Sequence, residues 1–119
     1  NEAPAAIGPY SHAILTDNIA FLSGQIPLDP STGKLVEGGI EEQTVQVLKN
    51  ISAVLNTAGL TFDNVIKTTV FLSDLANFKT VNEIYGKYFT SDCPARSCVQ
   101  VAALPMGSLV EIEVICARE

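Results

Sequence analysis

The sequence is short of charge. Only 17% of its 119 residues are Asp, Glu, Lys or Arg, whereas a typical globular domain has about a quarter. Mean hydropathy is only +0.28 and no long apolar run accompanies the deficit, so neither a membrane span nor a membrane partner is indicated. We expect instead that part of the surface of each protomer is covered by further copies of the chain, which implies an oligomer.

Basic residues are scarcer than acidic ones. Seven Lys and Arg stand against thirteen Asp and Glu, and the net charge is −6. A protein that neutralises the phosphates of a nucleic acid needs a basic surface, because those contacts supply most of the affinity. Seven scattered cations do not form such a surface, so a nucleic-acid partner is disfavoured.

Histidine and cysteine are sparse as well. His12 is the only histidine, and one imidazole makes neither a metal site nor a nucleophile–base pair. We expect it in a strand, solvated or hydrogen-bonded. Cys93, Cys98 and Cys116 are odd in number and lack CxxC spacing, so neither a disulfide framework nor a zinc site is indicated. Reduced thiols predict a cytoplasmic location. No signal peptide is visible, but a chain that begins at Asn1 leaves a removed organellar leader open.

What is present indicates one domain, residues 1–119. Alternating and β-branched segments predict strands, and apolar residues at three- and four-residue steps predict helices. The expected strands cover 13–16, 19–24, 65–72, 94–102 and 110–114, and the expected helices cover 41–58 and roughly 76–89. This order predicts an α+β fold, a mixed β-sheet with two helices packed on one face.

The last two strands carry side chains suited to chemistry. Arg96 and Cys98 share one face of the first strand, and Glu111 and Glu113 share one face of the second. Only about five residues separate the strands, so we expect them to be antiparallel neighbours. An arginine and two carboxylates would then lie together on the sheet face that the helices leave uncovered.

Two interpretations of this cluster stay open from the pattern alone. In one, Arg96 forms a structural salt bridge with Glu111 or Glu113. In the other, Arg96 is a fork for the carboxylate of a substrate, and one glutamate is an acid–base group or holds a water molecule.

The motifs of the chain are similar to those of a known family in order and spacing, over essentially its whole length. The similar segments are Ile7-Gly8-Pro9-Tyr10-Ser11, Ser23-Gly24-Gln25-Ile26-Pro27, Lys67-Thr68-Thr69-Val70, Pro94-Ala95-Arg96-Ser97-Cys98, Leu104-Pro105 and Glu111-Ile112-Glu113. In these segments the sequence resembles the Rid (YjgF/YER057c/UK114) family. Because it has Arg96, it is most similar to the RidA-like enamine/imine deaminase branch.

The resemblance implies a chorismate-mutase-like (YjgF-like) fold that assembles as a homotrimer with pockets at the subunit interfaces. It also implies hydrolysis of 2-aminoacrylate-type enamines and their imines, such as 2-iminobutanoate and 2-iminopropanoate, to 2-oxo acids and ammonia. Arg96 and Glu111 would be catalytic, and Arg96, Cys98, Tyr10 and Ser23 would bind the substrate. We expect no metal or organic cofactor, because this route requires none.

Other interpretations of the same residues remain. Tyr10 follows a turn and is alternatively a core aromatic. Cys98 is alternatively a nucleophile, although no histidine is placed to activate it. At the level of function, the rivals are a ligand-sensing or chaperone-like binding protein that uses the same pocket, and an endoribonuclease or translation inhibitor. The acidic composition and the absence of a histidine pair disfavour the ribonuclease.

Overall fold

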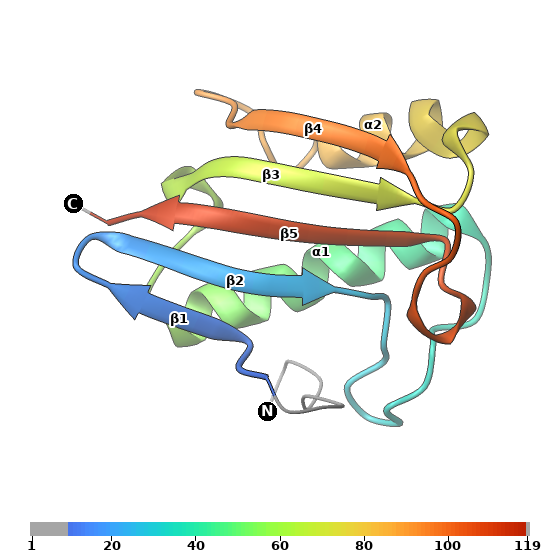
Figure 1. The fold of residues 1–119 in the computed structure, drawn as a ribbon, viewed down its shortest axis with the longest axis horizontal. Coiled ribbons are helices and arrows are strands. Elements are labelled where there is room, and N and C mark those ends of the chain that lie inside the picture. Colours follow the sequence, from blue (N-terminus) through green and yellow to red (C-terminus); the bar gives the residue numbers. More distant parts are fainter. Residues whose placement is uncertain (1–9, 119) are drawn as a thin grey trace.

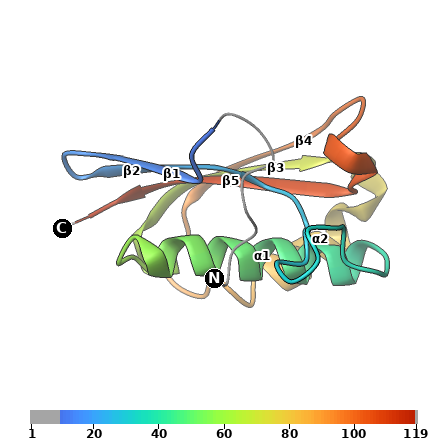
Figure 2. The same cartoon turned by 90° about the horizontal axis from the view of Figure 1, so that it is seen from below.

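The computed structural model describes residues 10–118 and places five strands in one sheet with both helices on one side of it (Figures 1 and 2). The elements are β1 (Ala13–Thr16), β2 (Ile19–Gln25), α1 (Ile40–Thr57), β3 (Val65–Leu72), α2 (Phe78–Tyr85), β4 (Ala95–Gln100) and β5 (Val110–Ala117), with short 3₁₀ turns η1 (Phe62–Asn64), η2 (Leu75–Asn77) and η3 (Pro105–Gly107). The predicted α+β class, the order of the elements and the one-sided placement of the helices are confirmed.

Strand β5 lies in the middle of the sheet, whose order is β1-β2-β5-β3-β4. Its aliphatic face is buried against the helices, as expected: Val110 and Ile112 are 0% exposed and Val114 is 1% exposed. Leu48 and Ile51 of α1 belong to the same core. Within residues 10–118, neither α1 nor α2 lies on the opposite face of the sheet (Figure 2). A side chain on that face of β5 therefore occupies the centre of an uncovered surface.

Helix α1 also fixes the loop that follows β2. Its apolar residues recur at three- and four-residue steps, and the stripe they form packs on the sheet. Asn50 lies within this buried stripe and is 0% exposed. Its side-chain amide donates to the carbonyls of Ile26 and Leu28, at 3.3 Å and 2.9 Å. These bonds satisfy a buried polar group and hold the segment after β2 against the helix.

Strand β4 is not the neighbour of β5, and the expected antiparallel pairing of these two strands is wrong. Strand β3 lies between them, antiparallel to β5 and parallel to β4. The end of β3 is bonded on both sides: Val101 N–H donates to the Leu72 carbonyl, and Ser73 N–H donates to the Leu109 carbonyl. Residues 101–109 thus pass around the end of β3 and connect β4 to β5. These two strands lie two strand spacings apart, or roughly 10 Å.

Two local features also differ from the sequence-based expectations. Helix α2 is shorter than 76–89, because a 3₁₀ turn comes first; the Asp74 carboxylate caps that turn by accepting a backbone N–H. Alternation predicts Ile66 on the same face of its strand as Val70 and Leu72; these two residues are buried, but Ile66 is 47% exposed. The pairing of β3 with β5 slips in register between Val65 and Lys67, and Val65 is buried instead.

Candidate active site

Arg96 lies on the edge strand β4 and points to the helix side of the sheet. The parallel register pairs it with Thr68, which is fully buried beneath the helices, and Cys98 shares that side. Glu111 and Glu113 project from the other side, so the common face expected for all four residues is wrong. Alternation fixes the faces within one strand, but the relation between two strands depends on the pairing, and β3 separates these two.

Neutral groups of α2 surround the Arg96 guanidinium. Arg96 Nη1 donates to Asn82 Oδ1 at 2.7 Å, and the guanidinium carbon lies 4.8 Å from the ring centroid of Tyr85 and 5.4 Å from that of Phe78. Within residues 10–118, no carboxylate forms an ion pair with Arg96. The salt bridge with Glu111 or Glu113 is therefore wrong within one protomer. The positive charge is left available to a ligand.

The sequence reasoning missed these three partners of Arg96. Phe78, Asn82 and Tyr85 follow one another at steps of four and three residues, so they share one helix face. Aromatic residues at helical spacing indicate a face that packs on the core, and Tyr85 is indeed buried. The signal that was available is Asn82, a polar residue between two aromatic ones on this face. Such a residue needs a hydrogen-bond partner nearby.

A pocket of about 390 Å³ opens beside Arg96. It is lined by Asn82, Tyr85, Gly86, Phe89, Cys93, Pro94 and Arg96. The cysteine in this lining is Cys93, whereas the half-buried Cys98 packs against the core. Burial raises the pKa of the Cys98 thiol, and the nearby Arg96 opposes this effect only in part. A thiol with a raised pKa is a poor nucleophile, which argues against covalent catalysis by Cys98.

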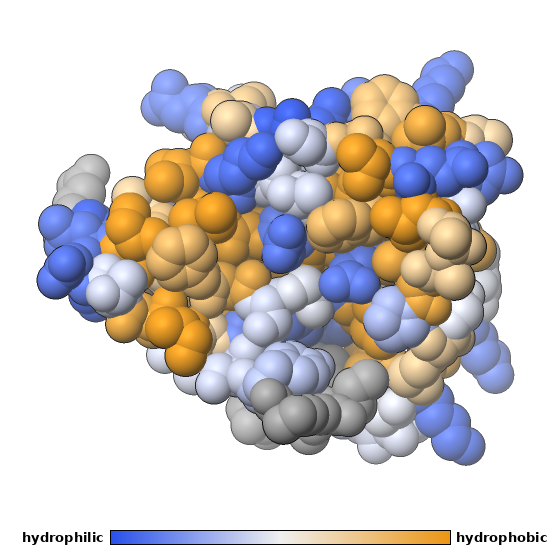
Figure 3. Space-filling view, in the orientation of Figure 1, coloured by the Kyte–Doolittle hydropathy of each residue, from blue (hydrophilic) through white to orange (hydrophobic). Residues whose placement is uncertain are grey.

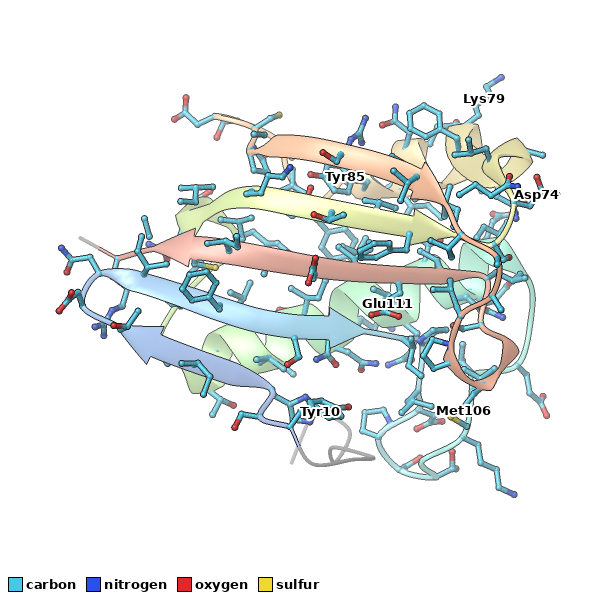
Figure 4. The ribbon with its side chains drawn as sticks, in the orientation of Figure 1. Tyr10, Asp74, Lys79, Tyr85, Met106 and Glu111 are labelled. Carbon is cyan, nitrogen blue, oxygen red and sulfur yellow. The ribbon has the colours of Figure 1, made fainter. Side chains whose placement is uncertain are left out.

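Glu111 lies on the uncovered face of β5, next to the end of β2 (Figure 4). Its carboxylate is half-buried and approaches Gly24 so closely that a Cβ atom there would clash with Glu111 Oε2. Burial raises the pKa of this carboxyl group, and the charge of Glu113 on the same face adds to the effect. Arg96 does not favour the ionised form within one protomer, because it lies on the other side of the sheet.

Ser23 lies on β2 of the β1–β2 hairpin, and Tyr10 lies in the segment that leads into β1. Ser23 directly precedes Gly24, and its hydroxyl and backbone N–H donate to the carbonyls of Ser11 and His12. Tyr10 is 44% exposed and meets the His12 ring edge-on, at a centroid distance of 5.9 Å. The alternative that Tyr10 is a core aromatic is therefore wrong. The Nδ1 atom of His12 is 3.2 Å from Gln25 Nε2, so the expected hydrogen bond is confirmed, but His12 directly precedes β1 and does not lie in a strand.

One protomer thus divides the candidate residues into two groups. Glu111, with Ser23 beside Gly24, belongs to the middle of the sheet and the hairpin. Arg96 and Cys98 lie on the helix side of the far edge strand. The structure of a single chain does not bring Arg96 to Glu111.

The uncovered sheet face is largely apolar (Figure 3). Ile14 and Phe21 on β1 and β2 are 55% and 48% exposed, and Val99 on β4 is 42% exposed. Glu113 and Lys67 add charge to the same face, and Lys67 Nζ donates to Ser97 Oγ at 3.0 Å. Exposed apolar clusters of this kind mark interaction surfaces in globular proteins.

A larger groove, of about 720 Å³, lies between α1 and residues 29–31 and 60–62. It contains none of the candidate residues. Its only carboxylate, Asp29, already accepts hydrogen bonds from the N–H and hydroxyl of Ser31.

Within residues 10–118, no cluster of three His, Cys, Asp or Glu side chains is arranged to hold a metal ion. No helix in that part of the chain is long and apolar enough to cross a membrane.

A family profile, relatives of known name and solved structures all match this chain over nearly its whole length. The family profile described as "Endoribonuclease L-PSP" matches residues 1–118. A human relative named 2-iminobutanoate/2-iminopropanoate deaminase is 56% identical over 117 residues, which are 98% of this chain and 85% of that protein. A solved Rid-family protein of Yersinia pestis is 57% identical with a TM-score of 0.94, covering 98% of this chain and 93% of the other. Escherichia coli TdcF, solved with bound serine, is 42% identical with a TM-score of 0.93, covering 99% and 94%.

Proposed function

Because the chain belongs to the Endoribonuclease L-PSP family, which is also called the Rid or YjgF family, we propose that it is an enamine/imine deaminase. It converts 2-aminoacrylate-type substrates, including 2-iminopropanoate and 2-iminobutanoate, to 2-oxo acids and ammonia. Close curated relatives bear the name of this activity. The observation that carries the proposal is the guanidinium of Arg96, which neutral groups hold and no carboxylate of residues 10–118 neutralises.

The substrate class suits this arginine. An imine derived from serine or threonine is small and planar and carries one carboxylate, and a guanidinium can bind a carboxylate through two parallel hydrogen bonds. The bonds would fix the plane of the C=N group as well as its position. The serine bound to the Escherichia coli relative is also a small carboxylate, which supports the same class of ligand.

The active site is proposed to form between copies of the chain in a homotrimer. The apolar residues Ile14, Phe21 and Val99 on the uncovered face support an interface there. Docking the β4 edge of one copy against this face would bring Arg96 of that copy to Glu111 of the next. This arrangement unites the two groups of residues that a single protomer keeps apart.

In the assembled site Glu111 is the group that activates water. Water adds to the imine carbon, the π electrons of the C=N bond move to nitrogen, and the proton released by water passes to the Glu111 carboxylate. Glu111 returns this proton to nitrogen, which gives the carbinolamine. Glu111 then takes the proton of the carbinolamine hydroxyl and passes it to the amino group, so that the C–N bond breaks, ammonia leaves and the C=O bond forms. Burial raises the pKa of this carboxyl group in a single protomer. In the assembled site the guanidinium of the neighbouring copy would oppose that effect and favour the ionised carboxylate, which is the form that accepts a proton from water. Ser23 and Tyr10 would contribute polar contacts from the hairpin, and Cys98 would contribute through its backbone.

The experiment supplies 2-aminoacrylate continuously, from serine and a pyridoxal-phosphate-dependent dehydratase. Oxo-acid release above the spontaneous rate, in proportion to the added protein, is the expected result. A protein that binds the 2-oxo acid without accelerating its release would instead be a sensor or chaperone-like binder. Cleavage of a labelled RNA by the same preparation, without deamination, would establish the ribonuclease. Both of these outcomes overturn the proposal.

A cytoplasmic location is also proposed, since all three cysteines are free thiols.

A further inference from the structure

The support beneath Arg96 is unusual because it is neutral. Arginines that must stay in one place are commonly held by a carboxylate, which also cancels their charge. Here the guanidinium contacts the Asn82 amide and the rings of Tyr85 and Phe78. A ring face attracts a cation through its quadrupole and leaves the net charge unchanged. This support can therefore fix the position of Arg96 while its charge remains available to an anion.

Among these three supports, Tyr85 is the one that is itself fixed. Its ring is 6% exposed, whereas Phe78 is 38% exposed and Asn82 lies on the surface. The Tyr85 hydroxyl is 2.8 Å from Thr68 Oγ1, and Thr68 is 0% exposed on β3. The ring also stacks on Phe89, with centroids 4.3 Å apart and planes inclined by 27°. Tyr85 is thus held by one buried hydrogen bond and one stacking contact.

Thr68 is also the register partner of Arg96. The strand pairing places the backbone of Arg96 beside Thr68, and the Thr68 hydroxyl places the ring of Tyr85. Thr68 therefore helps to position both ends of the Arg96 side chain: the backbone end through strand pairing, and the guanidinium end through Tyr85. An arginine has many rotamers, and ordering them on ligand binding would weaken affinity. Holding the guanidinium in advance removes that loss.

We propose that Tyr85 is a positioning residue: its ring face holds the Arg96 guanidinium at the depth and inclination at which it receives the substrate carboxylate. This inference rests on the proposed function, because it assumes that Arg96 binds a carboxylate. Tyr85 acts through Arg96 and takes no part in proton transfer. Its loss should raise KM with little change in kcat, because the carboxylate contact is the same in the ground state and the transition state.

The test varies the ring quadrupole while keeping the shape of the residue. Phenylalanine and phenylalanines with one, two and three ring fluorines are placed at position 85, in a Thr68→Val background so that no buried hydroxyl is left unpaired. Phenylalanine should keep KM within about threefold of wild type, and successive fluorines should raise it stepwise, to roughly 3- to 30-fold in all. A KM that does not depend on fluorine content overturns the proposal.

Phe62→Leu is the matched control for loosening of the aromatic cluster. Phe62 packs edge-on against Phe89, at 5.1 Å, and makes no contact with Arg96. The Phe62→Leu variant should have lower thermal stability and an unchanged KM. A rise in its KM equal to that of the trifluoro variant would mean that Tyr85 acts only through general packing, and would overturn the proposal.

Two readouts separate this proposal from the proposed function. Calorimetric titration with pyruvate measures carboxylate binding without turnover, and the guanidinium ¹H–¹⁵N resonances of Arg96 report the ring-current field of Tyr85. If the wild-type protein has no deaminase activity, the proposed function fails. Pyruvate affinity that still falls with fluorine content, together with displaced Arg96 resonances in Tyr85→Leu, would nevertheless support the role of Tyr85. Unchanged resonances and affinity would overturn it.

Discussion

The carboxylate of Glu111 occupies the space that a side chain at Gly24 would fill. Strand β2 is irregular at this point, because its pairing with β5 shifts in register between Leu22 and Gln25. The requirement for glycine here comes from close approach of a neighbouring side chain and not from backbone conformation. Gly24 therefore helps to set the direction in which Glu111 points.

Gly24→Ala should displace Glu111 and reduce turnover. The added methyl group clashes with the carboxylate, so we expect kcat to fall about 10-fold or more, since small displacements of a catalytic group are costly. The fold itself should be little affected, because the clashing atoms belong to the flexible end of the Glu111 side chain. Gly39→Ala is the control, because nothing lies within 4 Å of the place that its methyl group would take and φ is −99°. Wild-type kcat in Gly24→Ala would contradict the prediction.

The two glutamates of β5 should differ in their effects. Glu111→Gln keeps the shape and one acceptor but removes the base, so substrate binding should survive while turnover falls about 10²-fold or more. Glu113→Gln should leave the kinetics largely intact and lower the melting temperature of the oligomer. Steady-state kinetics and melting curves on both variants check this. A reversed pattern would transfer the catalytic role to Glu113.

Arg96→Lys should not restore function. An ammonium group cannot make two parallel bonds in the plane of a carboxylate, and losing a charged contact of this kind typically costs about 3–5 kcal/mol. We therefore expect kcat/KM to fall by roughly 10²- to 10⁴-fold. Arg118→Lys is the matched control, since Arg118 donates to the Asp17 carbonyl at the far hairpin. Turnover by Arg96→Lys at the wild-type rate would exclude the carboxylate role.

The fold could be predicted more completely from the sequence than the site. Strands such as 13–16 and 65–72 have clear alternation or β-branched content, and the stripe of α1 shows which face is buried. Pairing order is a long-range property, and nothing local states that β3 inserts between β4 and β5. The relation of Arg96 to Glu111 depended on that order. The neutral support of Arg96 was missed for the same reason, because it joins α2 to β4 across the sheet edge.

Phe21→Asp should dissociate the oligomer. Phe21 is 48% exposed on the uncovered sheet face, and a charge buried there would be unpaired. Light scattering should give a mass well above the 12.7 kDa of one chain for wild type, and close to it for the variant. Leu15→Asp is the control, because Leu15 is 42% exposed on the other face of the same hairpin. A wild-type protein that is monomeric at micromolar concentration would refute the proposed assembly.

The raised pKa of Glu111 predicts how stability depends on pH in the dissociated protomer. Burial, with the charge of Glu113 second, lifts this pKa above its ordinary value of 4.5. The folded protomer then holds the Glu111 proton more tightly than the unfolded chain does, so stability falls as pH rises through the window between the two values. Below the window both states are protonated and Glu111 adds no penalty; above it the penalty is complete.

In the Phe21→Asp background, Glu111→Gln should therefore raise the melting temperature at pH 7, with a gain that disappears as pH falls below the ordinary pKa of Glu111. Glu83→Gln, an exposed carboxylate on α2, controls for the loss of one negative charge. A gain that persists in acid would show that shape, not charge, is responsible. In the assembled protein the sign should reverse, because the guanidinium of a neighbouring copy would favour the ionised carboxylate. Equal effects in both backgrounds would mean that Arg96 of another copy does not reach Glu111.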